Sequence, residues 1–407
     1  MNRKVLGTLV LVWIGWFVIL YIFQWLVTQR FDVQRPDTAV SWSASETTLQ
    51  SNTRSLYLLN PFMNNQVAWD SEYYLGIATG GYNDPRAGVE TNPRTGHVIP
   101  RNYSFFPLYP YTMKALAVPL QVFALSPIAT ATLAGIIITL LGTLAGMMAL
   151  FDLTREYFDP DSGLRAVFYM LIFPTGFFFA QIYTEGLFIG LAFWSLALMK
   201  RKHWLWASLL AVLATGTRAH GAALALPLGV TWLMATDWKH FQASFSWKWV
   251  ARGFSVLLPV AAFLVWRYSP LGNGWAELQE FYFGRGLMAI ERSIGSWVSA
   301  FQYAQTNPPA AIYFGMEVFT VLLAFLTSLG LLRRDLPVAL FSLAVVVLSV
   351  FSGSAQSMAR YMLVAPAMFI SLSALGRNKA FDRSWTIASL LLMGMTAMLF
   401  TFKMWVG

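Results

Sequence analysis

Residues 5–27 read VLGTLVLVWIGWFVILYIFQWLV, a run of apolar side chains without a charged residue. A helix that crosses a bilayer takes about 20 mainly apolar residues, and this run is too long for a signal-peptide core, so we expect a retained first span. Similar runs recur along the 407 residues, of which 57% are hydrophobic and 12% charged. Because soluble domains carry about 25% charged residues, the sequence predicts an all-α polytopic membrane protein.

The spacing of these runs predicts about eleven membrane-spanning helices in a single integral-membrane domain, residues 1–407. Several are short for a straight crossing, so we expect tilted helices or helices broken at Pro174, Pro227 and Pro366. The proline-rich segment 105–125 is expected to be juxtamembrane or re-entrant. The expected spans are 5–27, 126–150, 164–181, 185–199, 204–217, 222–236, 253–268, 310–332, 336–352, 361–375 and 385–402.

Lysine and arginine gather in the short loops at one set of span ends, a distribution that marks the cytoplasmic side. It predicts a cytoplasmic N-terminus and accounts for the net charge of +9, so we expect no nucleic-acid partner. The basic residues on this side are Arg3, Lys4, Arg155, Arg165, Lys200, Arg201, Lys202, Lys239, Lys248, Arg252, Arg333, Arg334, Arg377, Lys379 and Arg383.

The opposite, extracytoplasmic side receives the residues that suggest chemistry. It carries two long loops, residues 28–104, which the juxtamembrane segment extends to 28–125, and residues 269–309. It also carries the short turns 181–185, 218–221 and 352–360. The spans were assigned from hydrophobicity alone, without regard to where the polar candidate residues would fall. Because these residues nevertheless lie on one side of the membrane, the sequence predicts an extracytoplasmic active site.

Several classes of chemistry are excluded by the residues that the chain lacks. Without cysteine it has no disulfide, thiolate catalysis or cysteine-based zinc site. Its four histidines include no His-x-x-x-His pair, so a transition-metal centre is not expected. The sequence also lacks a P-loop, a nucleophile-elbow serine, a zinc-protease helix and a dinucleotide fingerprint.

The first loop contains an acid among aromatic residues. Trp69, Tyr73 and Ile77 are spaced as one apolar stripe of a short helix, which we expect to lie on the membrane. Asp70 and Tyr74 would follow a neighbouring face, and Gly80-Gly81 would end the helix. Asp70 is either a solvated or capping charge or a catalytic carboxylate, and we favour the second.

Residues 105–110, FFPLYP, stand where the chain meets the bilayer again. They form either an aromatic belt with prolines, which is common at membrane interfaces, or the wall of a groove for a lipid chain or a sugar ring.

Ionisable residues near span ends form the remaining candidates, since such groups are costly to desolvate. Glu185 and Arg218 are either a structural ion pair or part of a site. Arg218, His220 or Arg360 could bind an anionic ligand, because arginine grips phosphate with two hydrogen bonds. Glu317 either belongs to the site or bridges helices. The spacing of Arg285, Glu291 and Arg292 indicates no role.

One carboxylate and several cations on one face suit a displacement reaction. The carboxylate would act as a base on an acceptor hydroxyl, and the cations would stabilise a departing phosphate. No cofactor is required, although a divalent metal at Asp70 and Glu72 stays open.

Five stretches of the chain now point to a family. They are Trp69-Asp70 with Ile77-Ala78 and Gly81-Tyr82; Phe105 to Pro110; Phe173-Pro174 with Phe178-Phe179-Ala180 and Tyr183 to Phe188; Arg218 to Gly221; and Arg360-Tyr361 before a span with Pro366. In this order they make the chain resemble the PIG-V family of mannosyltransferases, within the GT-C class of membrane glycosyltransferases.

The resemblance implies a GT-C fold, an inverting transfer and polyprenyl- or dolichyl-phosphate mannose as donor. It implies that Asp70 is catalytic, that Trp69 shapes the site around it, and that Glu185, Arg218 and Arg360 line the site. From their charge and position we expect Arg218, His220, Arg360 and Tyr361 to bind the donor phosphate. The residues expected to line the site are Trp69, Glu72, Tyr74, Tyr103, Phe106, Tyr109, Tyr183 and Glu185. Ala219-His220 stands where the eukaryotic pattern usually has Ser-Asn, so the resemblance assigns this turn no role in acceptor choice. The chain is also shorter than the eukaryotic relatives, so a glycosylphosphatidylinositol acceptor is not assumed.

The expected partners are therefore the lipid-phosphate sugar, a lipid or glycan acceptor and membrane lipids, in a prokaryotic plasma membrane. One alternative is a GT-C enzyme with another sugar or a protein acceptor. Another is a secondary transporter or lipid flippase, which would place ionisable residues near the bilayer midplane and often contain internal repeats. The chain has no obvious repeat, and its candidate residues lie near one surface.

Overall fold

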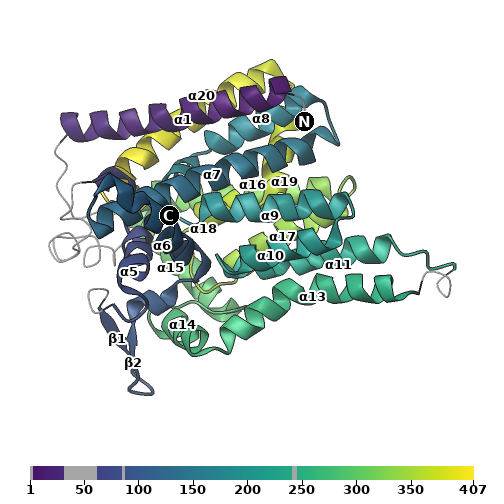
Figure 1. Ribbon diagram of the computed structural model, residues 1–407. Helices are drawn as coiled ribbons and strands as arrows, with labels where there is room; N and C mark the ends of the chain where they lie inside the picture. Colours follow the sequence, from purple (N-terminus) through teal and green to yellow (C-terminus); the bar gives the residue numbers. More distant parts are fainter. Residues whose placement is uncertain (1–2, 32–61, 85–87, 241–244) are drawn as a thin grey trace.

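A computed structural model of the chain describes residues 3–31, 62–84, 88–240 and 245–407, and these are almost entirely helical (Figure 1). The all-α prediction is confirmed. The α-helices are α1 Arg3–Arg30, α5 Asp70–Gly80, α6 Leu108–Leu120, α7 Pro127–Arg155, α8 Pro160–Leu171, α9 Glu185–Lys200, α10 Trp204–Thr215, α11 Ala225–Met234, α13 Trp247–Arg267, α14 Pro270–Phe281, α15 Ile290–Thr306, α16 Pro308–Leu331, α17 Leu336–Val350, α18 Met358–Tyr361, α19 Pro366–Leu375 and α20 Lys379–Thr401.

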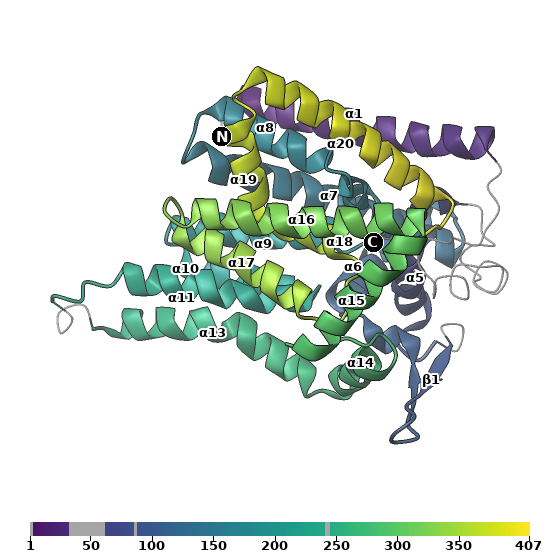
Figure 2. The same cartoon turned by 180° about the vertical axis from the view of Figure 1, so that it is seen from behind.

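Short elements connect these helices. The 3-10 helices are η1 Asn64–Gln66, η3 Arg101–Ser104, η4 Gln121–Phe123, η5 Gly176–Ala180, η6 Ala219–Leu224 and η7 Met362–Val364. Strands β1 Val89–Thr91 and β2 Val98–Pro100 form an antiparallel hairpin in which Glu90 pairs with Ile99. The hairpin projects from the end of the molecule that carries α5 and α14 (Figures 1 and 2).

A helix occupies each predicted span, although their lengths differ. Within the described ranges, five helices are long and apolar enough to cross a membrane by themselves: α1, α7, α13, α16 and α20. The segment 358–364 and α19 make a sixth if they are counted as one span, and they meet at an angle of 84° beside Pro366. α8 ends at Leu171, before Pro174. The total of eleven stays a prediction.

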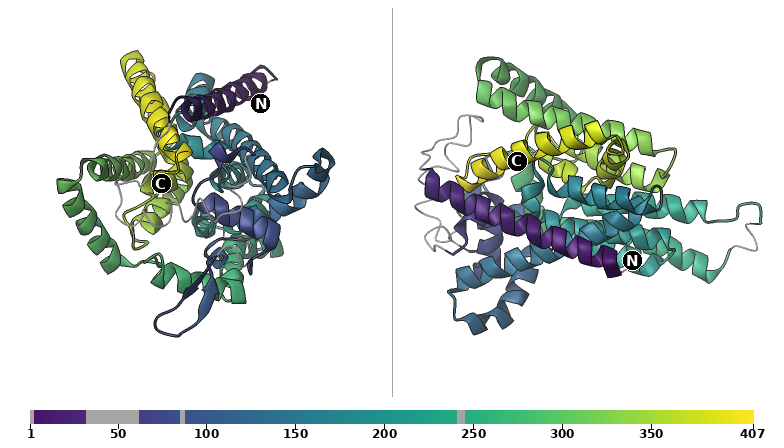
Figure 3. Two further views of the ribbon diagram at one scale, coloured as in Figure 1. Left: turned by 90° about the vertical axis from the view of Figure 1, so that its left-hand side faces the viewer. Right: turned by 90° about the horizontal axis from the view of Figure 1, so that it is seen from above.

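The helices are arranged in layers (Figures 1 and 3). α1 and α20 lie side by side along one edge, and α10, α11 and α13 form the opposite edge (Figures 1 and 3). Between them α7 crosses α9 closely: a Cβ atom added to Gly186 would lie 2.3 Å from the Thr139 carbonyl oxygen. Only glycine permits this approach, which places the first residue of α9, Glu185, against the middle of α7.

The prediction of a membrane-surface helix with a Trp69-Tyr73-Ile77 stripe is wrong. α5 begins at Asp70, so Trp69 precedes it, and Tyr74, Leu75 and Ile77 are buried within the protein. The helix packs inward because aromatic rings of α6 and the 181–184 turn cover it. Its predicted end is confirmed, since Gly81 adopts φ +82°, a conformation suited to glycine.

The two predicted external loops also contain helices. Residues 269–309 fold into α14 and α15, and 105–125 contain the short α6 followed by η4. Residues 32–61 and 85–87 of the first loop lie outside the described residues.

Candidate functional site

The backbone before Asp70 is strained and firmly held. Trp69 adopts φ 55° and ψ −114°, a combination that costs a bulky residue on the order of 1–3 kcal/mol. The Tyr183 hydroxyl donates to the Ala68 carbonyl at 3.0 Å, and the Trp69 ring packs edge-on against Trp405 at 4.6 Å. Asp70 then starts α5, where the helix dipole stabilises a carboxylate. These contacts fix the direction of its side chain.

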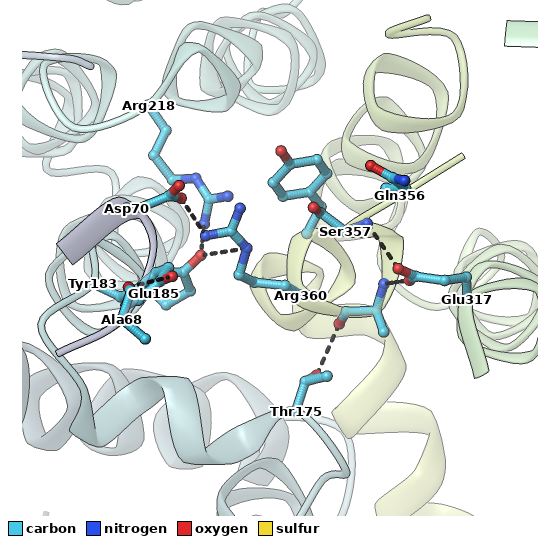
Figure 4. Close-up of polar contacts among 12 residues, drawn as sticks. Ala68, Asp70, Thr175, Tyr183, Glu185, Arg218, Glu317, Gln356, Ser357 and Arg360 are labelled. Atoms are coloured by element: carbon cyan, nitrogen blue, oxygen red, sulfur yellow. Dashed lines mark hydrogen bonds and ion pairs between the residues drawn. The ribbon is translucent and has the colours of Figure 1, made fainter. Parts of the chain in front are cut away.

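A chain of charges joins Asp70 to three other elements (Figure 4). Nη1 of Arg360 donates to Oδ2 of Asp70 at 2.6 Å, and Nε of Arg360 lies 3.8 Å from Oε1 of Glu185. Nη1 of Arg218 donates to the same Glu185 oxygen at 2.8 Å. The structural pair that we considered for Glu185 and Arg218 is therefore present. It is one part of a larger cluster.

Exposure distinguishes the two carboxylates. The Glu185 side chain is 1% exposed and the Asp70 side chain 23%, while Arg360 and Arg218 are 7% and 9% exposed. Asp70 is thus the more accessible of the two carboxylates, whereas Glu185 serves as the buried counter-ion of two arginines.

A third cation adjoins this cluster. The guanidinium carbons of Arg218, Arg285 and Arg360 lie 5.2, 5.2 and 5.3 Å from the centre of the Tyr361 ring. Arg285 donates to the Tyr361 hydroxyl at 2.6 Å and to the Gln356 carbonyl at 3.2 Å. No carboxylate of the described residues pairs with it. Three guanidinium groups therefore face two carboxylates, and the surplus positive charge favours an anion.

Glu317 of α16 holds the backbone that carries Arg360. Its Oε1 accepts a hydrogen bond from the Ser357 backbone N–H at 2.7 Å, and its Oε2 accepts one from that of Ala359. The Thr175 hydroxyl donates to the Ala359 carbonyl at 3.0 Å (Figure 4). Glu317 is thus the helix bridge that was one of its two predicted roles, and the bridge orients α18.

The segment between α14 and α15 positions Arg285. The backbone N–H of Gly286 donates to the Ser352 carbonyl, and that of Ala289 donates to the Phe351 carbonyl, both at 2.8 Å. A Cβ atom on Gly353, whose φ is +103°, would lie 2.3 Å from the Gly284 carbonyl oxygen. This close backbone contact brings Arg285 to Tyr361.

Three of the tyrosines predicted to line the site form one aromatic group, which consists of Tyr74 of α5 and two tyrosines packed against it. The Tyr74 ring meets those of Tyr109 and Tyr183 edge-on at 5.1 and 6.4 Å. The Tyr109 hydroxyl shares a hydrogen bond with Thr139 at 2.8 Å. Burial, followed by the charges of Asp70 and Glu185, raises the pKa of Tyr74 well above its usual range, so it stays a neutral phenol.

Other predicted site residues have different contacts. Phe106 packs on Trp266 and Trp275 at 5.5 and 5.4 Å, and the Tyr103 hydroxyl donates to Asn83 at 3.0 Å. Nε2 of His220 lies 3.0 Å from the Ser349 hydroxyl, with its ring 5.8 Å from that of Tyr361. Glu72 is half-buried in the first turn of α5.

Sequence reasoning assigned no role to Arg285 and did not mention Trp405, because no local pattern links either residue to Asp70. In the described ranges, no group of three or more His, Asp or Glu residues is placed to hold a metal ion.

A family model described as Mannosyltransferase (PIG-V) matches residues 11–226. No curated protein matches the chain. Among solved structures, ArnT from Cupriavidus metallidurans bound to undecaprenyl phosphate is similar at 15% identity and a TM-score of 0.45, over 86% of this chain and 75% of that one.

The archaeal oligosaccharyltransferase AglB from Archaeoglobus fulgidus, in complex with an inhibitory peptide and a dolichol-phosphate, is similar at 13% identity and a TM-score of 0.41. That match covers 96% of this chain and 55% of AglB, so the chain spans about half the length of the oligosaccharyltransferase.

Proposed function

The chain belongs to the PIG-V family of mannosyltransferases, whose model matches more than half of it, and we propose that it transfers mannose from polyprenyl-phosphate mannose to a hydroxyl of a lipid or glycan acceptor. It is an integral membrane enzyme. The observation that carries the proposal is the Asp70–Arg360 pair, a partly exposed carboxylate beside a cluster with surplus positive charge.

The arginines suit the leaving group. When the bond between mannose C1 and the phosphate oxygen breaks, its electron pair goes to the phosphate, which gains negative charge. Arg285, which pairs with no carboxylate of the described residues, is available to bind this phosphate, and Arg218 and Arg360 lie around the same tyrosine ring. Charge stabilisation of this kind removes the need for an acid that protonates the leaving group. The proposal requires no cofactor.

Asp70 suits the role of base. The acceptor oxygen forms the new bond to C1, and its proton passes to Asp70. Asp70 has the exposure this requires, whereas Glu185 is buried and already bound by Arg218. One displacement from the side opposite the phosphate inverts C1. A single carboxylate suffices, unlike the pair that most glycosidases use.

The proposal also includes the side of the membrane on which the reaction takes place. The positive-inside distribution supports a cytoplasmic N-terminus and an extracytoplasmic Asp70, in a prokaryotic plasma membrane.

The test is sugar transfer by the purified enzyme in lipid nanodiscs. Wild type, Asp70→Asn and the control Asp237→Asn, which changes an exposed acid of the α11–α13 connection, would receive radiolabelled polyprenyl-phosphate mannose and membrane extract. General-base catalysis contributes about 10²–10⁴-fold, so we expect Asp70→Asn to lose at least a hundredfold and the control to keep full rate. Transfer by Asp70→Asn at the wild-type rate would show that another group is the base.

A further inference from the structure

A second candidate site lies at the opposite end of the molecule from Asp70. A groove of about 580 Å³ runs between α1, α8 and α20. Its walls are apolar and include Leu9, Val12, Leu164, Phe168 and Ile387.

The groove is separate from the catalytic cluster. α1 lines it at Thr8–Val12 and only later reaches Gln24, which accepts a hydrogen bond at 3.1 Å from Gln66, four residues before Asp70, and donates one at 3.1 Å to Thr401. α20 lines it at residues 382–387 and ends at Thr401. At 1.5 Å of helix per residue, the residues that line the groove lie roughly 20–25 Å along α1 and α20 from the contact between Gln24 and Thr401. Thr8–Val12 lie in the first half of α1, towards the end of this helix marked N in Figure 1.

Basic residues border the groove. Arg165 lies 3.9 Å from Asp382 and donates to the Ser373 carbonyl at 3.0 Å, while the Tyr169 hydroxyl donates to Asp382 at 2.6 Å. The single acid of the groove lining is therefore already bound. Arg383 also lines the groove and is exposed, and no residue of the described ranges bonds or pairs with it.

Further positive charge lies close by. Arg3 and Lys4 begin α1, one turn before Thr8, and both are exposed. The groove thus has an apolar wall, and several basic side chains lie beside it near the start of α1.

We propose that this groove binds an anionic glycerophospholipid. One acyl chain lies along the apolar wall, and the phosphate receives hydrogen bonds from Arg383, with Arg165 beside it. Basic pockets between membrane helices bind anionic head groups in this manner, and an unpaired guanidinium can hold a phosphate with two hydrogen bonds. A soluble anion would leave the wall uncovered, and a neutral lipid would leave Arg383 unpaired. This inference does not depend on sugar transfer.

Native mass spectrometry of the purified full chain tests it. Wild-type protein would be given equal amounts of phosphatidylglycerol and phosphatidylcholine with identical acyl chains. We expect wild type to retain several-fold more phosphatidylglycerol and Arg383→Gln to retain the two lipids about equally. The matched control is Arg333→Gln, which removes an exposed arginine from the α16–α17 turn at the same end of the molecule.

A second variant tests the apolar wall. Ile387 is exposed, so Ile387→Trp should fill the groove without unfolding the protein and lower the retention of both lipids. Equal retention of the two lipids by wild type would overturn the proposal. A loss in Arg333→Gln as large as that in Arg383→Gln would overturn it too, because it would indicate general surface attraction. Size-exclusion profiles would confirm that each variant is folded.

Discussion

Asp70 and Arg360 form an ion pair of 2.6 Å although 290 positions separate them in the sequence. In this arrangement Arg360 neutralises the proposed base, and it is also one of the three arginines around Tyr361. A donor phosphate that draws Arg360 toward itself would free Asp70 for the acceptor hydroxyl. The pair thereby gives a physical reason for the donor to bind first.

Arg285→Gln is expected to weaken donor binding without destabilising the protein. Arg285 pairs with no described carboxylate, so its removal leaves no buried charge uncompensated. A hydrogen bond to a charged group is worth about 1.5–3 kcal/mol, or roughly a 10–100-fold rise in KM for the donor. Steady-state kinetics and the Tm would be compared with those of Arg292→Gln, an exposed neighbour. An unchanged KM would remove Arg285 from the phosphate site.

Arg218→Gln should instead destabilise the fold. It leaves Glu185, which is 1% exposed, without its closest counter-ion. Breaking a buried ion pair from one side costs about 3–5 kcal/mol. Thermal unfolding would measure the loss, and adding Glu185→Gln should restore part of it. If the double variant were less stable than Arg218→Gln, the charge of Glu185 would not be the cause.

Glu317→Gln is expected to lower kcat more than it raises the acceptor KM. A glutamine side chain has one acceptor oxygen, so it satisfies only one of the Ser357 and Ala359 N–H groups. α18 would shift and Arg360 would lose its alignment with Asp70. A variant that lost stability but kept the wild-type kcat would show that Glu317 has a purely structural role.

Gly186→Ala should disrupt the α7–α9 crossing. The added Cβ would lie 2.3 Å from a backbone oxygen, whereas a Cβ at Gly315 of α16 meets no atom within 4 Å. Overpacking typically costs about 1–3 kcal/mol, so Gly186→Ala should lower the Tm and Gly315→Ala should not. Equal Tm values for both variants would contradict the close crossing.

Asn83→Cys tests the sidedness. Asn83 is exposed near the end of α5, and the chain contains no other cysteine. A membrane-impermeant thiol reagent added outside intact cells should label it. Labelling that occurred only after the membrane was opened would reverse the proposed topology.

Features that depend on neighbouring residues in the sequence, such as helices, helix ends and bends, could be predicted from local sequence patterns. Apolar runs predicted the helices, Gly81 the end of α5, and Pro366 the bend between 358–364 and α19. The acid at 70 was recognisable because aromatic residues surround it in the sequence.

What the sequence could not predict depends on distant contacts. Arg285 meets Tyr361 across 76 positions, and Trp405 meets Trp69 from the far end of the chain. The stripe expected on α5 was wrong because periodicity does not tell whether lipid or protein covers an apolar face.

The contacts of Trp69 and Asp70 have a consequence for biosynthesis. Both residues are synthesised early, whereas Arg360 and Trp405, which pair with Asp70 and pack on Trp69, leave the ribosome hundreds of residues later. In a nascent chain, Trp69 and Asp70 are therefore present long before the residues that contact them. The ion pair of Asp70 and the packing of Trp69 can therefore form only after nearly the whole chain has been synthesised.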